Sequence, residues 1–279
     1  MPVSLLGASE IRRLAAELDV TPTKKLGQNF VVDANTVRKI VQAARVTASD
    51  RVVEIGPGLG SLTLAILETG ASVVAVEIDH RLAERLPSTA AAHDVPAGRL
   101  TVIDADALRV DELPGEPGVL VANLPYNVSV PVLLHFLETF PYLRRGVVMV
   151  QAEVGERLAA PPGSKIYGAP SVKAAWYGSW RLAGTVSRQV FWPVPNVDSV
   201  LVGFDRDAEA RGTEEHRLRT FQIVDAAFQQ RRKMLRQALS GVLGGTAAEA
   251  SAHLEAAGVD PTLRGEQLTV EDYARIAAV

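Results

Sequence analysis

The sequence predicts an α/β protein in which a mostly parallel, helix-covered β-sheet precedes a small helical domain. Short apolar runs alternate with helical patterns through the first half of the chain, which is typical of parallel sheets covered on both faces. From about Gly184 the pattern changes to two alternating, hairpin-like strands. Beyond Asp205 only helical segments with glycine-rich joints remain. We therefore predict a sheet domain at 1–205 and a helical domain at 206–279.

The apolar runs and helical patterns place the individual elements in order. Strands are expected at 51–55, 72–78, within 99–108, at 118–123, 146–151, 185–192 and 198–204. Helices are expected at 8–18, from the cap Asp33 to Ala44, and at 61–68, 79–86 and 131–138. A polar, glycine-containing loop is expected at 24–33.

Composition excludes several classes of protein. The 279 residues are 47% hydrophobic and include no cysteine, so a substantial core is possible but disulfides and cysteine-based zinc sites are not. No metal site is expected. No run of 18 apolar residues occurs, so neither a membrane span nor a signal peptide is indicated, and a cytoplasmic location is expected. With a net charge of −3, a nucleic-acid partner would require a local basic patch.

A glycine-rich turn joins the predicted strand 51–55 to the helix that follows. Gly56, Gly58 and Gly60 lie in "EIGPGLG", where absent side chains let the backbone turn tightly and approach a ligand. Their spacing differs from the dinucleotide-binding pattern. Taken alone, the turn is equally compatible with a tight connection that binds nothing.

Two acids at the ends of the next strands favour a nucleoside-bearing ligand. Glu77 ends the second strand, where a carboxylate can accept hydrogen bonds from ribose hydroxyls. An acid that only starts the following helix would be Asp79 rather than Glu77. Asp106 follows the third strand and can accept from an adenine amino group, with Asp104 as a competitor and a helix cap as the plain alternative. The set predicts an adenosine-bearing cofactor at the carboxyl edge of the sheet.

The fourth strand delivers Asn123, Leu124, Pro125 and Tyr126 to the same edge. The lone pair of an adenine amine is delocalised into the ring, and acceptors that hold both amine hydrogens would localise it toward an electrophile. The Asn123 side chain and the Leu124 carbonyl, restricted by the following proline, are two such acceptors, and Tyr126 offers a ring on which a base stacks. The methyl of a sulfonium such as S-adenosylmethionine would be the electrophile. A turn that closes a strand is the plain alternative.

With these features, the sequence resembles the small-subunit ribosomal RNA adenine N6,N6-dimethyltransferases. The matching stretches follow the family order over nearly the whole chain: "KKLGQNF" (24–30), "VVEIGPGLGSLTLAI" (52–66), "VVAVEID" (73–79), "DADAL" (104–108), "VANLPYNVS" (121–129), "FWPVPNVDSVLV" (191–202) and "FQQRRKMLRQAL" (228–239). The resemblance implies a Rossmann-like, S-adenosylmethionine-dependent methyltransferase sheet with a small C-terminal helical domain that grips RNA. It also implies dimethylation of two adjacent adenines in a hairpin loop near the 3′ end of small-subunit (16S) rRNA, on immature small ribosomal subunits. A monomer is expected.

The resemblance also implies residue roles. The cofactor-binding set would be Gln28, Asn29, Val31, Gly56, Glu77, Asp106 and Asn123. Val31 would contribute through its backbone, although members of the family usually have leucine there. Asn123 and Leu124 would hold the target amine and Tyr126 would stack the base. Phe191 would close the base pocket, unless it is simply a core aromatic beside a proline-rich turn.

A basic segment precedes the C-terminal helices. Between His216 and Ser240 lie six arginines and lysines and one acid, Asp225: Arg217, Arg219, Arg231, Arg232, Lys233 and Arg236. The stretch "QQRRKMLRQ" is expected to form a helix with a dense positive face. An RNA phosphate site is therefore predicted at Arg231, Arg232, Lys233 and Arg236. Arg144 and Arg145 are expected to extend this surface or simply to precede a strand.

Other functions fit the sequence less well. The erythromycin-resistance methyltransferases of large-subunit rRNA share the Gln-Asn-Phe loop but differ in the glycine turn and the tetrapeptide, and a DNA adenine methyltransferase more often carries a Pro-Pro-Tyr motif. A mainly non-catalytic ribosome-assembly factor would not need Asn123, Tyr126, Glu77 and Asp106 together. A nicotinamide dehydrogenase is suggested by the glycine turn alone and lacks the required spacing.

Overall fold

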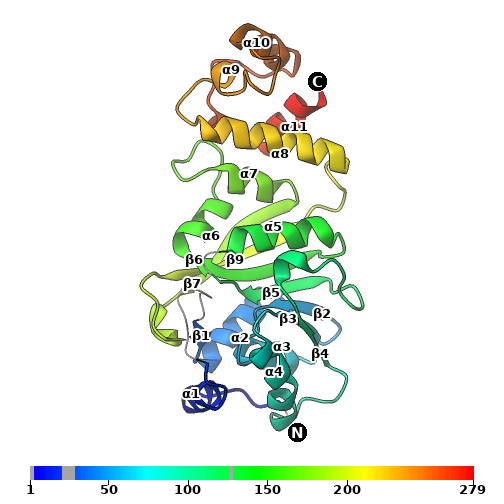
Figure 1. The fold of residues 1–279 in the computed structure, drawn as a ribbon, viewed down its shortest axis with the longest axis vertical. Helices are drawn as coiled ribbons and strands as arrows, with labels where there is room; N and C mark the ends of the chain where they lie inside the picture. The colour runs from blue at the N-terminus through cyan, green and yellow to red at the C-terminus, as the bar shows by residue number, and fades with distance from the viewer. Residues whose placement is uncertain (1–2, 21–28, 126–127) are drawn as a thin grey trace. The chain divides into compact units, whose positions relative to one another are not determined.

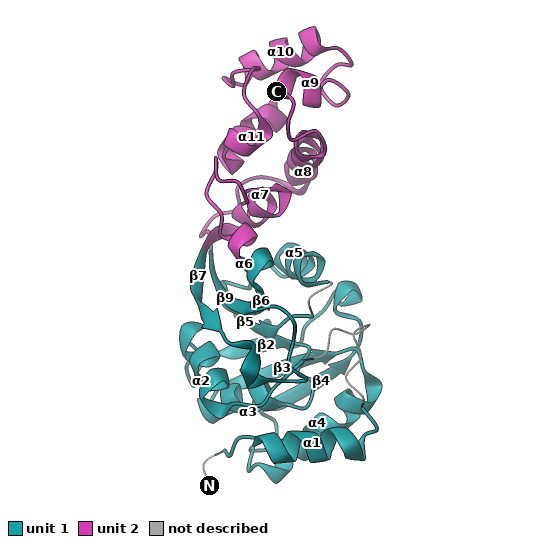
Figure 2. Cartoon of the chain, turned by 90° about the vertical axis from the view of Figure 1, so that its left-hand side faces the viewer, with its two compact units in different colours: residues 1–155, 181–206 teal, residues 156–180, 207–279 magenta. Residues whose placement is uncertain are grey.

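The computed structural model describes residues 3–20, 29–125 and 128–279, which form two compact units. The first comprises Met1–Gly155 and Arg181–Arg206, and the second comprises Glu156–Trp180 and Asp207–Val279 (Figure 2). The later boundary falls beside the predicted one at 205, but 156–180 had been assigned to the first domain. This segment joins the second unit because its side chains bond to the C-terminal helices. The Tyr167 hydroxyl donates to the Leu268 carbonyl at 2.9 Å, and the Lys173 ammonium lies 2.7 Å from an Asp225 carboxylate oxygen.

A seven-stranded sheet forms the centre of the first unit, in the order β4-β3-β2-β5-β6-β9-β7 (Figure 1). The strands are β2 (Arg51–Ile55), β3 (Ser72–Glu77), β4 (Leu100–Asp104), β5 (Val119–Asn123), β6 (Arg145–Gln151), β7 (Gly178–Val186) and β9 (Ser199–Arg206). The five neighbouring strands β4, β3, β2, β5 and β6 are parallel to one another. Strand β9 runs antiparallel to β6. The mostly parallel α/β sheet is therefore confirmed, and the carboxyl ends of β2 to β5 meet at one edge.

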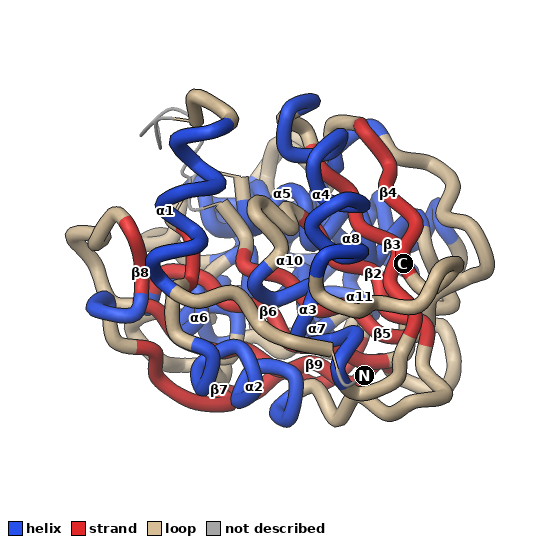
Figure 3. Tube along the Cα trace, turned by 90° about the horizontal axis from the view of Figure 1, so that it is seen from below, coloured by secondary structure: helices blue, strands red, loops and turns tan. Residues whose placement is uncertain are grey.

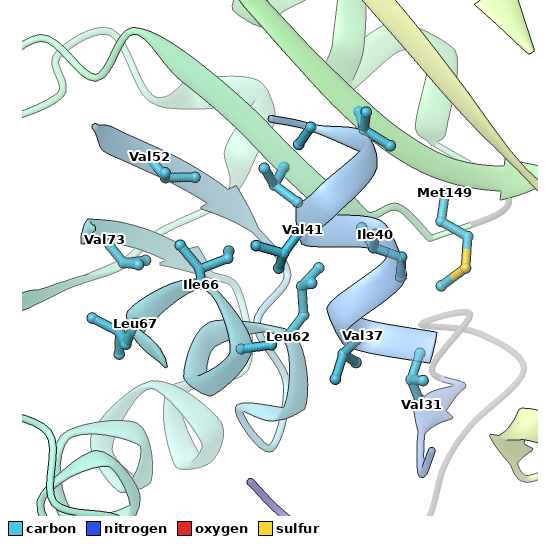
Figure 4. Close-up of a cluster of buried hydrophobic side chains, with 14 of the residues drawn as sticks. Val31, Val37, Ile40, Val41, Val52, Leu62, Ile66, Leu67, Val73 and Met149 are labelled. Carbon is cyan, nitrogen blue, oxygen red and sulfur yellow. The ribbon is translucent and has the colours of Figure 1, made fainter. Parts of the chain in front are cut away.

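Helices cover both faces of this sheet. They are α1 (Ala8–Glu17), α2 (Ala34–Ala43), α3 (Ser61–Glu68), α4 (His80–Ala92) and α5 (Ser129–Thr139). Figure 3 shows α2 and α5 on opposite sides of the strands. The Asp33 side chain accepts the Thr36 N–H at 2.8 Å and so starts α2 as predicted. Apolar residues three and four apart then face inward, and Figure 4 shows Val37 and Val41 with Leu62 and Ile66 of α3 in one buried cluster.

A two-stranded antiparallel pair lies apart from the main sheet. Strand β1 (Phe30–Val31) pairs with β8 (Phe191–Trp192), and the Phe30 and Trp192 rings stack with their centroids 6.3 Å apart. The prediction of one strand over 185–192 was therefore wrong. The chain leaves the main sheet after β7, forms a 3₁₀ turn at Arg188–Val190, and uses the last two residues to hold the N-terminal segment.

The second unit is helical, as the sequence predicted. Its helices include α7 (Ala169–Ala175), α8 (Glu214–Gln229), α9 (Leu235–Ala238), α10 (Ala247–Ala256) and α11 (Val270–Ala278), while α6 (Ala152–Leu158) spans the boundary. Tyr273 lies at its centre, fully buried, and its hydroxyl donates to the Gly265 carbonyl at 2.9 Å. None of the helices among the described residues is long and apolar enough to span a membrane.

The helix predicted over the basic stretch at 229–237 is not formed. Helix α8 ends at Gln229, residues 230–233 make a turn, and Met234 precedes the short α9. The Leu235 and Arg236 N–H groups bond instead to the Leu263 and Pro261 carbonyls, at 2.7 and 3.1 Å. Tertiary hydrogen bonds thus replace the bonds of a continuous helix, because the chain packs against a loop that sequence periodicity does not reveal.

Candidate active site

A cavity of about 250 Å³ lies at the carboxyl edge of the sheet, beyond the ends of β2, β3 and β5. Its walls come from several parts of the first unit: the β1 segment, the glycine turn with the start of α3, the turns after β3 and β4, the end of β5, and residues of α4 and α5. The polar residues that line it are Asn29, Glu54, Ser61, Glu77, Asp106 and Asn123. Parallel strands bring these residues together from distant positions, at the edge where α/β sheets bind ligands.

The glycine turn forms the floor of the cavity. Gly56 and Gly58 have φ angles of 68° and 57°, which side-chain-bearing residues rarely adopt. A Cβ on Gly58 would lie 2.9 Å from Cε1 of Phe30, so the turn and the β1 segment touch closely. The turn leads directly into α3, whose first residue, Ser61, also lines the cavity.

Glu77 holds its carboxylate in a fixed position at the end of β3. Its Oε2 accepts the Gly58 N–H at 3.0 Å, and its Oε1 accepts the Ile78 and Asp79 N–H groups, each at 3.0 Å. Burial raises the Glu77 pKa, and these three donors oppose the rise. Oε2, which accepts only one of these bonds, retains a lone pair that can accept from a ligand hydroxyl. Asp79 instead caps α4 and pairs with Arg81, so it takes the helix-start role that the sequence left open.

Asp106, rather than Asp104, faces the cavity. Asp104 is exposed at the end of β4 and pairs with His80, whose pKa is raised by that hydrogen bond. Asp106 lines the cavity and accepts the Leu108 N–H at 3.0 Å, which starts a 3₁₀ turn at Ala107–Arg109. Capping and facing the cavity are therefore compatible roles for this carboxylate.

The tetrapeptide at 123–126 brings two candidate residues, Asn123 and Leu124, to this edge. Asn123 ends β5, and its Nδ2 donates to the Asn29 carbonyl at 3.0 Å. This bond orients the amide so that its oxygen is the atom available as an acceptor. Leu124 is buried, and its N–H donates to the Met149 carbonyl at 3.0 Å, which fixes the backbone after the strand. Tyr126 and Gln28, the other candidates from these two segments, lie outside the described residues.

The β1 segment brings Asn29 and Val31 to the cavity but leaves Phe191 in the core. Asn29, Phe30 and Val31 line the cavity, whereas Phe191 pairs with Val31 and is only 2% exposed within a cluster of buried apolar side chains. The neighbouring Trp192 stacks on Phe30 and is only partly buried. This placement agrees with the alternative interpretation of Phe191 as a core aromatic, and its contact with a base stays a prediction.

Sequence reasoning missed two kinds of lining residue. Glu54 and Ser61 are polar groups in the floor, and Ile78 and Leu108 are large apolar side chains that remain exposed at the cavity. Glu54 carried a signal, because it is the only acid inside the apolar strand "RVVEI". The two exposed apolar residues carried none, since single apolar residues beside a turn are ordinary.

The predicted basic set is divided by the structure of the second unit. Arg231 pairs with Glu266 and donates to the Lys165 carbonyl at 2.7 Å, and Arg217 is 6% exposed beside Glu214. Both arginines therefore have structural partners. Arg232 and Lys233 are exposed in the turn at 230–233, which we call the basic turn, and Arg236 is partly buried on α9.

The family model described as "Ribosomal RNA adenine dimethylase" matches residues 21–279. The chain belongs to this family. A protein named "Ribosomal RNA small subunit methyltransferase A" from Leifsonia xyli is 70% identical over 98% of both chains. One with the same name from Streptomyces coelicolor is 59% identical over 99% of this chain and 97% of its own.

Solved structures agree with the family assignment at the level of fold. A dimethyladenosine transferase from Plasmodium falciparum has a TM-score of 0.76 at 23% identity, covering 88% of this chain and 94% of that one. The 23S rRNA methyltransferase ErmE has a TM-score of 0.67 at 26% identity, covering 90% and 98%. The fold is thus the Rossmann-like α/β fold of S-adenosylmethionine-dependent methyltransferases, and the protein is an rRNA adenine dimethyltransferase.

The cavity residues fit S-adenosylmethionine, the cofactor of this family. Three carboxyl groups, those of Glu54, Glu77 and Asp106, line the cavity, and no lysine, arginine or histidine does so within the described part of the chain. S-adenosylmethionine carries a positive sulfonium, a positive ammonium and a negative carboxylate, so its net charge is positive and an acidic cavity complements it. The Glu54 Oε2 and Ser61 Oγ atoms are buried and have no hydrogen-bond partner among the described residues, which suits a site completed by a polar ligand.

Proposed function

We propose that this protein methylates the N6 atoms of two adjacent adenines in a hairpin loop near the 3′ end of small-subunit ribosomal RNA. The family supports rRNA adenine dimethylation, and the small-subunit names belong to relatives that are 59% and 70% identical. One structural observation carries the chemistry: Glu77, Asp106 and Asn123 come from three different strand ends and line one cavity. Cofactor acids and the proposed amine acceptor are therefore adjacent.

Cofactor recognition is assigned to the walls of this cavity. Glu77 accepts from the ribose hydroxyls, because its oxygens are already oriented by three backbone donors. Asp106 accepts from the adenine amino group, and Gly56 lets the backbone approach the ligand. Asn29 and Val31 contact the cofactor from β1, and we retain Gln28 as a further contact.

Amine activation is assigned to the end of β5. The cofactor supplies a methyl group already activated by its sulfonium. The Asn123 side-chain oxygen and the Leu124 carbonyl accept the two amine hydrogens and so favour a pyramidal nitrogen with a localised lone pair. Because Asn123 is tied to the Asn29 carbonyl, it meets the amine without first reorganising. We propose that Tyr126 stacks the target base and that Phe191 supports this pocket from behind β1.

RNA gripping is assigned to the second unit. Arg232 and Lys233 are exposed, so they contact phosphate in this proposal, with Arg236 beside them. Arg231, predicted as a phosphate contact, has a second role in holding the basic turn through Glu266. We further propose that the enzyme acts as a cytoplasmic monomer on immature small ribosomal subunits.

The second candidate substrate is large-subunit rRNA, which the likeness to ErmE at 26% identity favours. Transfer of labelled methyl groups to immature small subunits and, separately, to protein-free large-subunit rRNA distinguishes the two. We expect N6,N6-dimethyladenosine in the small-subunit rRNA at two adjacent positions after nuclease mapping. Labelling confined to large-subunit rRNA, or confined to a single adenine, would overturn the proposal.

A further inference from the structure

Glu54 is a buried acid in the cofactor cavity that the proposed reaction does not use. It lies on β2, the strand that leads into the glycine turn, and is 1% exposed while still lining the cavity. Its Oε2 has no hydrogen-bond partner among the described residues. A buried carboxyl group with an unpartnered oxygen is costly, so its retention at this position points to a ligand.

The groups around Glu54 are acidic or neutral. Glu77 faces it from β3, and Asp106 lies across the same cavity after β4. Strand β5 contributes the neutral Asn123, and α3 contributes the hydroxyls of Ser61 and Thr63. The Thr63 hydroxyl opposes part of the change in the Glu54 pKa, although the two groups do not meet hydrogen-bond geometry. No cationic side chain of the described residues lines the cavity.

The two neighbouring acids, Glu54 and Glu77, differ in what stabilises their ionised forms. Burial, opposed by Thr63 and reinforced by the negative charge of Glu77, raises the Glu54 pKa to about 8. Glu77 is also buried but receives three backbone N–H bonds that stabilise its ionised form. With a pKa of about 8, Glu54 holds a proton near neutral pH.

We propose that Glu54 is a proton-exchanging positioning residue: it is protonated in the empty cavity and releases its proton to solvent when the cationic cofactor enters. The resulting carboxylate then provides a counter-charge inside the cavity. The product, S-adenosylhomocysteine, has one positive charge fewer because its sulfur is a neutral thioether. Glu54 regains its proton more readily against the product, which favours product exchange. This inference rests on the assignment of the cavity to S-adenosylmethionine.

Calorimetry tests the proposal without measuring methyl transfer. Wild type and Glu54→Gln are titrated with S-adenosylmethionine at pH 7 in buffers of different ionisation enthalpy, which gives the number of protons released. Glutamine has the shape of the protonated acid. Subtracting the proton release of Glu54→Gln from that of wild type removes the contribution of the cofactor's own amino group, which is the same for both proteins. We expect wild type to release roughly 0.9 proton more than Glu54→Gln, given a pKa of about 8.

The affinities provide a second reading. When the pH falls from 7 to 6, the dissociation constant of wild type for S-adenosylmethionine should rise by a factor that is about ten times the factor for Glu54→Gln. The reason is that lowering the pH by one unit makes ionisation of Glu54 harder. Titration with S-adenosylhomocysteine should release fewer protons than titration with S-adenosylmethionine. Equal release by wild type and Glu54→Gln, or by the two ligands, would overturn the proposal.

Two variants separate this failure from a wrong cavity assignment. Asp106→Asn removes another carboxyl group from the same cavity and should keep the proton release of Glu54. Glu77→Ala should weaken binding itself. If Glu77→Ala and Asp106→Asn both bind the cofactor like wild type, the cavity assignment is wrong. If they weaken binding while Glu54→Gln releases as many protons as wild type, only the proton-exchange proposal is wrong.

Discussion

Glu77 illustrates how single residues in this cavity are oriented before a ligand arrives. Its two oxygens are fixed by the N–H groups of the glycine turn and of the start of α4. Asn123 is likewise tied to the Asn29 carbonyl. Groups that are already oriented lose little freedom on binding, which strengthens both recognition and catalysis. Three predictions follow at this scale.

Glu77→Ala should weaken S-adenosylmethionine binding by about 1.5–3 kcal/mol, because hydrogen bonds to a charged acceptor are lost. Isothermal calorimetry on the purified variant measures the change. Glu84→Ala, an exposed acid on α4, is the matched control and should bind normally. An unchanged dissociation constant in a folded Glu77→Ala protein would remove Glu77 from the site.

Asn123→Ala should slow methyl transfer more than it weakens RNA binding, because the lost acceptor acts on the amine in the transition state. We expect the single-turnover rate to fall by roughly 100-fold, by analogy with the loss of one oriented transition-state group. The rate must be measured on immature small subunits at saturating cofactor, since Asn123 also lines the cofactor cavity. Wild-type transfer under saturation would reduce the tetrapeptide to a turn.

The stability of the cofactor-free protein should depend on pH through Glu54. Its pKa is raised by burial to about 8 in the folded protein, from 4.5. The folded state therefore binds more protons than the unfolded state between these values, and the free energy of unfolding falls as pH rises through this window. Glu54→Gln should lose this fall. Urea unfolding of both proteins at pH 5 and pH 8 measures the change in the free energy of unfolding between the two pH values. The same change in both proteins would contradict the assignment of Glu54 as a buried acid with a raised pKa.

At the scale of elements, two connections determine what the strands and helices can do. The glycine turn places α3 and Glu77 around the cavity and touches β1 through Gly58. In the second unit, the basic turn replaces a predicted helix and is held by the Arg231–Glu266 ion pair. In both cases the connection, rather than the regular element, presents the candidate functional groups.

Gly58→Ala should damage both stability and cofactor binding. Its φ of 57° is strained for alanine by roughly 1–2 kcal/mol, and its Cβ would lie 2.9 Å from Phe30. Gly98→Ala is the matched control, because its φ is 83° but a Cβ there meets nothing within 4 Å. Gly98→Ala should introduce only the backbone strain and retain cofactor affinity. If Gly58→Ala and Gly98→Ala, both shown by urea unfolding to be folded, lost cofactor affinity equally, the clash with Phe30 would have no role.

Replacing Arg232 and Lys233 together with glutamine should weaken RNA binding and flatten its dependence on salt. Two lost phosphate contacts reduce the slope of log affinity against log salt by about 1.5, while cofactor affinity persists. Arg231 is kept, because its loss would disturb the basic turn. The control replaces Arg12 and Lys39, exposed cations of the first unit, with glutamine. Matching slopes for the two double variants would deny the basic turn a special role.

At the scale of the molecule, the sheet and its cofactor edge could be predicted from the sequence, whereas contacts between distant segments could not. The strand 51–55 and the helix 61–68 have their predicted bounds, because a buried parallel strand is a continuous apolar run and a glycine turn follows it. The β1–β8 pair has only two residues on each side, too few for a pattern. The place of 156–180 in the second unit depends on partners near 225 and 268.

The candidate site divides in the same way. The position of Gly56, Glu77, Asp106 and Asn123 at one cavity was predictable, because each lies at or just after the end of a recognisable strand and parallel strand ends meet at one edge. The state of Glu54 was not predictable, since protonation depends on burial and on the absence of a neighbouring cation. The structural partners of Arg231 and Arg217 were equally invisible, because charge counting does not show which cations are already paired.

The β1–β8 pair also limits when, during synthesis of the chain, the cofactor cavity can be completed. A ribosome completes β2 to β6 well before it reaches Trp192, so the parallel core and its acids can assemble first. Phe30 acquires its ring partner, and β1 its backbone partner, only when β8 emerges. One wall of the cofactor cavity is therefore completed only after nearly the entire first unit has been synthesised, and we expect an incomplete chain to bind S-adenosylmethionine more weakly than the finished protein.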